Sequence, residues 1–460
     1  MTQIPSPDLI RKYDRPGPRY TSYPTAPEWT DAFGPAQYEE ALARADVRKE
    51  PLSVYVHLPF CREMCRFCGC NVVATHDRSR ADAYLDVLEK EVELVAHRLP
   101  NRRGFTQLHW GGGTPTFLDE RQLERCHAIL TRHFQFEAGG EKAIEIDPAI
   151  TTRSQIALLA KLGFNRISMG VQDFDARVQE VVGRIQGFDE TRDLVLAARE
   201  HGFDGVNLDL IYGLPYQTPE TWKHTLDQIL EIRPDRMAVF GFAYVPWAKP
   251  HQRLLPQDAL PRTEQRVELF LQSVEAFTKA GYRLIGLDHF ALESDELARA
   301  QDAGYLFRNF QGYTVRPAPD TVAFGMTSIG DIGGAYAQNA HRLRDWAERV
   351  EKGELPVEKG AAMTDDDVMR RFVINRVMCL LRLDLGEVEE RFGSTGRADI
   401  TASLEKGRPE LEADGLVTFD GKVLRVTPLG QLLVRNVAML FDAYLGKHAG
   451  DKKPTFSRTV

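Results

Sequence analysis

Hydrophobic and polar positions follow two alternating periods along most of the chain after residue 52. Short apolar runs typical of buried strands are each followed by a loop and then by a stretch in which apolar residues recur every three or four positions. One such helix is predicted at 79–98, and Asp119 is the predicted N-cap of another that reaches about 133. The runs that predict strands are 53–57, 105–110, 143–147, 166–171, 206–212 and 236–242.

Three junctions between a predicted helix and the next strand share one local pattern: Gly163-Phe164, Gly202-Phe203 and Gly281-Tyr282. In each, the glycine can adopt the left-handed conformation that ends a helix, and the aromatic residue begins the following strand. Repeated strand-helix units imply a parallel sheet, and six or more in a row favour an α/β fold with a barrel or a partial (βα)6 barrel. Functional residues in such a fold lie at the carboxyl ends of the strands.

The two ends of the chain differ from this barrel pattern. Residues 1–50 contain several prolines and a basic, tyrosine-rich piece, which predict an extended N-terminal arm. The arm is either a surface strap or a flap that offers Arg15 and Arg19 to carboxylates. Residues 51–355 form the predicted barrel with its less regular extension, and residues 360–460 form a separate C-terminal domain.

The C-terminal domain is predicted to be mainly helical and winged-helix-like. A helix is expected at 365–381, a hairpin turns at Asp420-Gly421, and a final helix covers 429–445. Domains of this kind often bind DNA, but the formal net charge of −8 favours packing against the barrel instead. We therefore expect no nucleic-acid partner.

Composition and hydropathy bear on the cellular compartment of the protein. Of the 460 residues, 43% are hydrophobic and 27% are charged, as in ordinary globular proteins, and no apolar run approaches the length of a membrane span. The N-terminal residues lack the continuous apolar core of a signal peptide. The sequence therefore predicts a cytoplasmic protein with no membrane partner.

Four of the six cysteines fall between residues 61 and 70, in a loop directly after a predicted strand. Cys61, Cys65 and Cys68 have the spacing C-x3-C-x2-C, which places three thiolates around one iron-sulfur cluster and leaves a fourth iron open to an external ligand. Zinc is the alternative, although structural zinc sites usually take their cysteines as two separated pairs. Cys126 and Cys379 occupy apolar helical positions and are predicted to lie in the core.

Two carboxylates and a glycine-rich turn follow predicted strands. Glu145 and Asp209 each alternate with aliphatic residues, so they face the inside of a barrel and require a cation or a hydroxyl donor there. A structural ion-pair network is the alternative. The glycines at 111–113 allow a ligand to approach the backbone closely, or they form only a tight turn, since the lysine of a phosphate loop is missing.

These residues resemble a known superfamily. The spacing C-x3-C-x2-C with an aromatic residue, Phe67, before the last cysteine is similar to the signature of radical S-adenosylmethionine (SAM) proteins. With Cys70 and the preceding YVHLPF, the loop resembles the oxygen-independent coproporphyrinogen III oxidases in particular. Further motifs agree along nearly the whole chain: PRYTSYP at 18–24, HWGGGTPT at 109–116, SMGVQDF at 168–174 and NFQGY at 309–313.

The resemblance implies a radical SAM barrel with one [4Fe–4S] cluster on Cys61, Cys65 and Cys68. It also implies that the amino and carboxylate groups of one SAM chelate the open iron, and that an electron from the cluster splits SAM into methionine and a 5′-deoxyadenosyl radical. Arg184 suits a carboxylate. The residues implied around this first SAM are Tyr55, Gly112, Gly113, Thr114, Glu145, Gln172, Arg184, Asp209 and Ala243.

The same family binds a second SAM, so two SAM molecules per chain are expected. Catalytic roles are implied for Cys70, Tyr55 and His57. The chain departs from the family at 323–330, where it reads AFGMTSIG in place of G-x-G-x-S-A-I-S, and at 242–244, where Phe-Ala-Tyr replaces Tyr-Ala-His. The residues implied around the second SAM are Phe67, Gly69, Cys70, Phe310, Gln311 and Ile329.

The implied reaction converts two propionate side chains of coproporphyrinogen III to vinyl groups and gives protoporphyrinogen IX for haem biosynthesis. An unidentified reductant, similar to flavodoxin or ferredoxin, and a monomeric state are also implied. One alternative is the related haem chaperone, but those relatives generally lack Cys70 and the RYTSYP arm, which this chain has. A haem-degrading radical SAM methyltransferase is the other alternative, because it shares much of the loop.

Overall fold

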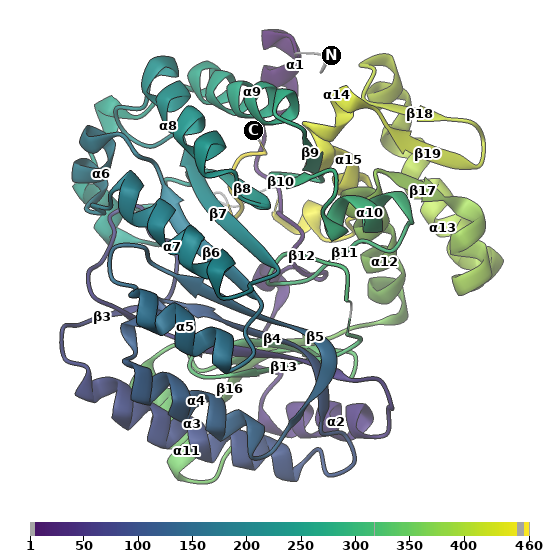
Figure 1. Cartoon of the computed structure of the whole chain (residues 1–460). Coiled ribbons are helices and arrows are strands. Elements are labelled where there is room, and N and C mark those ends of the chain that lie inside the picture. Colours follow the sequence, from purple (N-terminus) through teal and green to yellow (C-terminus); the bar gives the residue numbers. More distant parts are fainter. Residues whose placement is uncertain (1–4, 317, 449–454, 460) are drawn as a thin grey trace. The chain divides into compact units, whose positions relative to one another are not determined.

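The computed structural model describes residues 5–316, 318–448 and 455–459, and for His448 only the backbone. These residues divide into two compact units (Figure 1). The barrel unit contains residues 29–261 and 318–362, and the second unit contains the described parts of 1–28, 262–317 and 363–460. None of the helices in this part of the chain has the length and apolar content needed to cross a bilayer.

The barrel unit is built on six neighbouring parallel strands, as the sequence predicts. Their register is parallel at every junction. The predicted partial (βα)6 barrel is therefore confirmed. In spatial order the strands are β1 (Leu52–Leu58), β4 (Gly104–Gly112), β5 (Gln135–Ile146), β6 (Arg166–Gln172), β7 (Gly205–Tyr212) and β8 (Arg236–Gly241).

Helices follow these strands along the outside of the sheet (Figure 1). Asp119, Thr152 and Thr218 cap three of them by accepting a hydrogen bond from the third residue of the helix. Gly163 and Gly202 take the predicted left-handed conformation before β6 and β7. The helices are α3 (Ser79–His97), α4 (Glu120–Thr131), α5 (Arg153–Lys161), α6 (Ala176–Val182), α7 (Phe188–Glu200) and α8 (Pro219–Ile232).

An extension widens the sheet beyond β1. The strand β13 (Thr321–Phe324) runs parallel to β1, and the next three strands are antiparallel. A buried carboxylate, Asp320, fixes this edge by pairing with Arg48 and Arg102. The remaining elements are α2 (Pro35–Asp46), β14 (Ile329–Ile332), β15 (Ala335–Asn339), α11 (Leu343–Glu351) and β16 (Val357–Ala362).

The second unit has a helical core with a small antiparallel sheet. Its predicted hairpin turns at Asp420-Gly421, and its two strands pair with a third strand in the order β17-β19-β18. The apolar faces of the helices share one core with this sheet. The main elements are α9 (Thr263–Lys279), β9 (Tyr282–Ile285), β10 (His289–Leu292), α10 (Glu296–Asp302), β11 (Phe307–Arg308), β12 (Tyr313–Thr314), α12 (Asp365–Leu380), β17 (Arg382–Asp384), α13 (Leu385–Ala413), β18 (Val417–Phe419) and β19 (Val423–Val426).

The final helix predicted at 429–445 is wrong. The segment breaks into α14 (Pro428–Gln431), α15 (Val434–Ala438) and short 3-10 turns. Leu433 leaves the helical conformation between α14 and α15, and Asp442 is extended. Side chains of this segment bind the N-terminal arm, as where the Asn436 side-chain amide donates to the Tyr13 carbonyl at 3.0 Å.

The arm is extended only in part, so its prediction is also wrong for two segments. Pro7 and Pro35 stand at the first positions of α1 (Pro7–Tyr13) and α2, where a proline starts a helix and does not break one. Arg19 pairs with Asp288, and the Tyr20 hydroxyl donates to Asp442. These contacts within the second unit support the strap interpretation.

Candidate functional site

The cysteine loop is closed at its base by the strands that flank it. Cys61 lies in β2 (Phe60–Cys61), which pairs in parallel with β3 (Val73–Ala74) directly beyond β1. The amide of Thr75 donates to the carbonyl of Cys61 at 2.9 Å. The loop between β2 and β3 therefore projects from the carboxyl end of the barrel strand β1.

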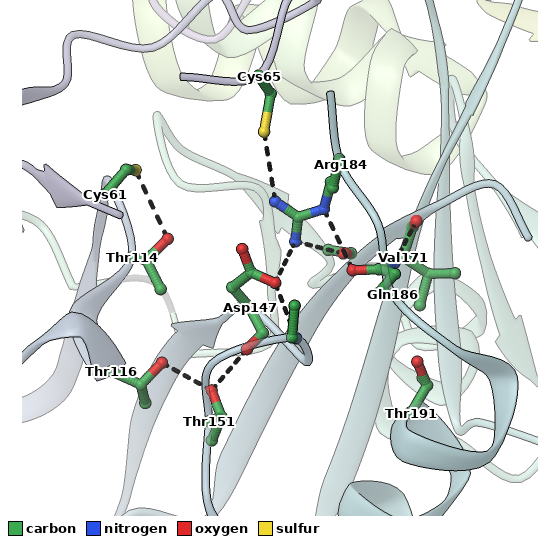
Figure 2. Close-up of polar contacts among 12 residues, drawn as sticks. Cys61, Cys65, Thr114, Thr116, Asp147, Thr151, Val171, Arg184, Gln186 and Thr191 are labelled. Carbon is green, nitrogen blue, oxygen red and sulfur yellow. Dashed lines mark hydrogen bonds and ion pairs between the residues drawn. The ribbon is translucent and has the colours of Figure 1, made fainter. Parts of the chain in front are cut away.

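Two of the three predicted ligands already contact polar groups of the barrel (Figure 2). The Sγ of Cys61 lies 3.6 Å from the Oγ1 of Thr114, and the Sγ of Cys65 lies 3.8 Å from the Nη1 of Arg184. Burial raises the pKa of the Cys61 thiol to about 12, and at Cys65 the nearby guanidinium offsets part of the same effect. A bound metal deprotonates such thiols outright.

The apolar side of the loop is anchored by Phe67, the residue before the last predicted ligand. Its ring packs against a cluster of side chains at the ends of α6, β7 and β8 that includes Val178, Val182 and Phe242. The neighbouring Arg66 donates through its backbone to Val182 at 2.8 Å. The aromatic residue of the signature thus holds the loop against the barrel.

The described residues contain no preformed site for a single metal ion. Among the residues that the structure describes, no three His, Cys, Asp or Glu side chains are close enough together to hold a single metal ion. A four-iron cluster is much larger than one ion, so its cysteines stand farther apart. All six cysteines are free, and Cys126 and Cys379 are buried in the core as predicted.

The glycine turn at 111–113 lies against the side chains of its neighbours. A Cβ on Gly111 would lie 2.7 Å from Glu145, and one on Gly113 would lie 2.6 Å from the Pro59 carbonyl carbon. Gly112 has φ = +110°. The amides of residues 112–114 already donate to Glu145, Leu58 and Phe60, so the backbone groups that the two glycines can offer a ligand are their carbonyl oxygens. Carbonyls suit an ammonium group such as that of SAM.

Tyr55 and His57 lie side by side at the end of β1. The Tyr55 hydroxyl and the Nδ1 of His57 are 3.1 Å apart, and the Nε2 of His57 lies 3.0 Å from the carbonyl of Asn71. The carbonyl can only accept, so Nε2 carries the proton and Nδ1 accepts from Tyr55. Burial lowers the pKa of His57 to about 4, and the ring is therefore neutral.

Glu145 is held by His109 from the neighbouring strand. The Nε2 of His109 lies 3.0 Å from Oε1 of Glu145, and the ring of His109 stacks on Tyr55. Burial opposes ionisation, but the bonds from His109 and Gly112 outweigh it and lower the pKa of Glu145. The side chain keeps 43% of its surface exposed, so it can accept further hydrogen bonds.

Arg184 is the centre of the polar contacts in Figure 2. Its Nη2 lies 3.0 Å from Oδ1 of Asp147 and donates to the Gly170 carbonyl at 2.6 Å, while its Nε donates to Gln186 at 3.2 Å. Asp147 directly follows β5. The guanidinium is therefore fixed on three sides while one edge faces Cys65.

Gln172 ends β6 in a strained conformation. Its φ is +68°, a value that side-chain-bearing residues seldom adopt outside functional sites. Its Oε1 is buried and has no hydrogen-bond partner in the described part of the chain. A buried acceptor of this kind is costly unless a ligand donates to it.

Asp209 and Ala243 complete the predicted first SAM set. Asp209 accepts from the Ser168 hydroxyl at 3.1 Å and from the Asn207 amide at 2.7 Å. Ala243 is exposed just beyond β8, and its carbonyl accepts from Gln252. All residues of this set lie in the barrel unit, at or near the carboxyl ends of β1 and β4 to β8.

The residues predicted around a second SAM do not all belong to one unit. Phe67, Gly69, Cys70 and Ile329 lie in the barrel unit, where Cys70 is exposed and its amide contacts the Sγ of Cys68 at 3.3 Å. Phe310 and Gln311 lie in the second unit, where the Gln311 amide donates to the side chain of Asn309.

Sequence reasoning missed His109, Asp147 and Gln186, which orient Glu145 and Arg184. Two signals were available: His109 stands two residues before the glycines, and Asp147 is the last residue of a predicted strand that already carried a predicted ligand. Their partners lie on other strands and loops, and the local pattern does not show this.

The residues fit the implied cofactors. The three predicted ligand thiols are free and lie in one loop, and Arg184 offers a fixed positive charge beside Cys65. The unpaired acceptor of Gln172 and the partly exposed Glu145 can receive hydrogen bonds. The donor set therefore suits an iron-sulfur cluster with an amino-acid ligand on its open iron.

Comparisons with known proteins agree with this arrangement. The model of the radical SAM superfamily matches residues 55–229, and the model of the HemN C-terminal domain matches residues 363–433. The oxygen-independent coproporphyrinogen III oxidase of Synechocystis is 42% identical over 458 residues, which are 99% of this chain and 98% of the relative. The corresponding protein of Escherichia coli is 44% identical over 454 residues, 98% of each chain.

A solved structure shares the fold over nearly the whole length. The coproporphyrinogen III oxidase (HemN) from Escherichia coli, described as a radical SAM enzyme, superposes with a TM-score of 0.91 and 41% identity over 97% of this chain and 100% of that one. The chain belongs to the oxygen-independent coproporphyrinogen III oxidases of the radical SAM superfamily.

Proposed function

We propose that this chain removes carbon dioxide from two propionate side chains of coproporphyrinogen III without oxygen, leaving vinyl groups and giving protoporphyrinogen IX. The observation that carries the proposal is the meeting of the cysteine loop, the glycine turn and Arg184 at the carboxyl ends of the barrel strands. In this proposal the segment 51–355 is the catalytic barrel together with its extension, and 360–460 is the C-terminal domain.

When bound, the cluster and SAM would supply a 5′-deoxyadenosyl radical able to abstract a hydrogen atom from the β-carbon of a propionate. The side chain then releases carbon dioxide and passes one electron to a one-electron acceptor. Cys61, Cys65 and Cys68 would hold the cluster. A flavodoxin- or ferredoxin-like protein provides its electron.

The other residues bind and orient the first SAM. Arg184 pairs with the SAM carboxylate, because its guanidinium is fixed by Asp147 and lies beside Cys65. The turn at 112–114 accepts from the amino group, and Glu145, Gln172 and Asp209 accept from donors elsewhere on the molecule. Holding the reactants in one orientation lowers the entropic part of the barrier, and excluding water protects the radical.

Tyr55 and His57 have a positioning role in this proposal. Both ring nitrogens of His57 are engaged, with Tyr55 and with the Asn71 carbonyl. The neutral imidazole therefore aims the hydroxyl of Tyr55, while Cys70, exposed beside the last ligand, serves the substrate side.

An anaerobic assay tests this function. Reconstituted protein is given SAM, a strong reductant and coproporphyrinogen III, and the tetrapyrroles are analysed by mass. Sequential loss of two carboxyl groups, with methionine and 5′-deoxyadenosine as co-products, is expected. Stoichiometric haem binding without turnover would support a chaperone instead, and methyl transfer to a tetrapyrrole would support a haem-degrading methyltransferase.

We also infer that each chain binds two SAM molecules and acts as a monomer. Equilibrium dialysis of the cluster-loaded protein against labelled SAM counts the bound molecules, and sedimentation gives the mass. Saturation at one SAM per chain would contradict the first inference, and a mass twice that of the chain would contradict the second.

A further inference from the structure

Three side chains of one short segment bind the backbone of the cysteine loop. The Nζ of Lys249 donates to the carbonyl of Cys70 at 2.9 Å, and the Nε2 of His251 lies 2.8 Å from the carbonyl of Cys68. The Nε2 of Gln252 donates to the carbonyl of Phe67 at 3.0 Å. Lys249, His251 and Gln252, here called the carbonyl clasp, thus hold three of the four consecutive carbonyls at 67–70.

Gln252 is the buried centre of the clasp. Only 1% of its surface is exposed, although it is a polar residue. Its amide also donates to the Ala243 carbonyl at 3.1 Å, and its Oε1 accepts from the Val245 amide at 2.6 Å. A single side chain therefore joins the end of the cysteine loop to Ala243, a residue of the predicted SAM set.

The clasp and α6 hold the loop from different elements. The first part of the cysteine loop is held at Arg66, which donates to the carbonyls of Val181 and Val182 at the end of α6. The C-terminal side, which carries Cys68 and Cys70, is held by the clasp, in and around the 3-10 turn at Pro250–Leu254. The two anchors leave the thiols themselves available for iron.

We propose that Lys249, His251 and Gln252 are positioning residues that fix the backbone of Cys68 and Cys70. They would thereby help the loop to retain the cluster and keep the cluster at a fixed position relative to Ala243, just beyond β8. Groups that orient a metal ligand without touching the metal commonly decide its affinity. A loop already held in its binding geometry loses less conformational entropy when the cluster assembles. The inference rests on the proposed function, because it takes the loop to carry a [4Fe–4S] cluster.

The test compares Gln252→Leu with a matched control, Gln155→Leu. Gln155 is also buried, with 4% of its surface exposed. Its amide likewise donates to two carbonyls, of Thr116 and Leu118, and its Oε1 accepts from the Thr152 amide at 3.0 Å. Each substitution leaves two carbonyls and one N–H unpaired, so a general loss of stability affects both variants alike.

The measurement is the rate at which the anaerobically reconstituted cluster loses iron to a chelator, followed by absorbance. Gln252→Leu is expected to lose iron about 10- to 100-fold faster than wild type, the range typical of residues that orient metal ligands. Gln155→Leu is expected to match wild type. The electron paramagnetic resonance (EPR) signal of the reduced cluster should change on SAM addition in wild type and in Gln155→Leu, and should change less in Gln252→Leu.

Equal iron loss from the two glutamine variants would overturn the inference and leave the proposed function intact. Wild-type protein that assembles no [4Fe–4S] cluster would overturn the proposed function itself, and the inference with it. If Gln252→Leu does not fold, the double variant Lys249→Met/His251→Leu decides, because it removes two donors at a partly exposed segment. Faster iron loss supports the clasp, and an unchanged rate contradicts it.

Discussion

Two sets of polar side chains in the barrel unit differ in how completely they are bonded. Glu91 is 1% exposed, and both of its carboxylate oxygens are satisfied within the fold. Its Oε2 accepts from the Gly325 amide at 2.8 Å and from the Trp346 indole at 3.0 Å, and its Oε1 accepts from the Asn339 amide at 2.6 Å. Such a network ties α3 to the extension and has nothing left for a ligand.

The side chains around the cysteine loop retain bonding capacity. Glu145 is bonded by His109 and Gly112 yet keeps 43% of its side chain exposed, and Gln172 has a buried oxygen without a partner in the described residues. Buried polar groups are normally paired. Several acceptor atoms that can still accept hydrogen bonds, all at one end of a barrel, therefore indicate a ligand site. The comparison separates a carboxylate that stabilises the fold from one that serves binding.

Removing a predicted cluster ligand should have the largest effect on the site around the cysteine loop. Cys61→Ala is expected to abolish cluster formation and turnover, since two thiolates cannot hold the cluster in place of three. Iron analysis and visible absorption check the first effect. The control is Cys126→Ala in the core, which should lose about 1–2 kcal/mol of stability through its cavity and keep the cluster. A cluster present in Cys61→Ala would contradict the assignment.

Cys70→Ser should separate cluster binding from turnover. Cys70 is exposed, and its backbone amide contacts the Sγ of Cys68 at 3.3 Å. Serine keeps that backbone and nearly the same size, so iron content should stay at the wild-type level. Turnover should fall about 100-fold, equivalent to about 2.7 kcal/mol of transition-state stabilisation, because Cys70 serves the substrate side in the proposed function. Undiminished turnover with an intact cluster would remove Cys70 from the substrate side.

Asp147→Asn tests whether the bonding around Arg184 serves the ligand. The pair is mostly buried, with 12% of the Arg184 side chain and 18% of that of Asp147 exposed. Without the charge of Asp147 the guanidinium is less firmly held, and the KM for SAM should rise about 10-fold with little change in iron content.

The matched control for Asp147→Asn is Asp193→Asn, which weakens an exposed pair with Arg153. Such surface pairs contribute little, so both the KM for SAM and the stability should stay near wild type. An unchanged KM in Asp147→Asn would show that Arg184 needs only the Gly170 carbonyl and Gln186 to stay in place.

The sequence predicted those features that depend on neighbouring residues. The six barrel strands are short apolar runs whose period is visible locally, and the three cluster cysteines fall within eight residues. The positioning residues could not be found in this way, because Gln252 and Phe67 are 185 positions apart in sequence. Contacts across such separations are set by the packing of whole elements.

Helix α13 shows the same limit within a single element. Its glycines and Pro409 suggest a loop, and no helix was predicted there. The structure interrupts the helix at Gly393, where φ is +76°, and packs Gly396 so closely on Phe392 that a Cβ would lie 2.7 Å from its side chain. The glycines therefore allow a kink and a close approach, which a propensity argument counts only as penalties.

Glu91→Gln tests the structural role of the buried carboxylate through the pH dependence of the free energy of unfolding. Burial raises the pKa of Glu91 from 4.5 to about 7, although three N–H donors oppose the shift. The folded protein therefore binds this proton more tightly than the unfolded chain, so wild-type stability falls as the pH rises from about 4.5 to about 7 and is level above that. Glutamine does not titrate. At low pH the variant is expected to be less stable than wild type, because an N–H of its side-chain amide would face the N–H that the Asn339 side chain donates at this position.

The difference in the free energy of unfolding should therefore move in favour of Glu91→Gln by up to about 3 kcal/mol between pH 4.5 and 7.5, as expected for a shift of roughly two units or more. Urea unfolding at a series of pH values measures it. Glu351→Gln, at an exposed position of α11 in the same extension, should differ from wild type by a constant amount. If the curves of Glu91→Gln and wild type run parallel, the carboxylate is ionised throughout, and its three donors fully offset its burial.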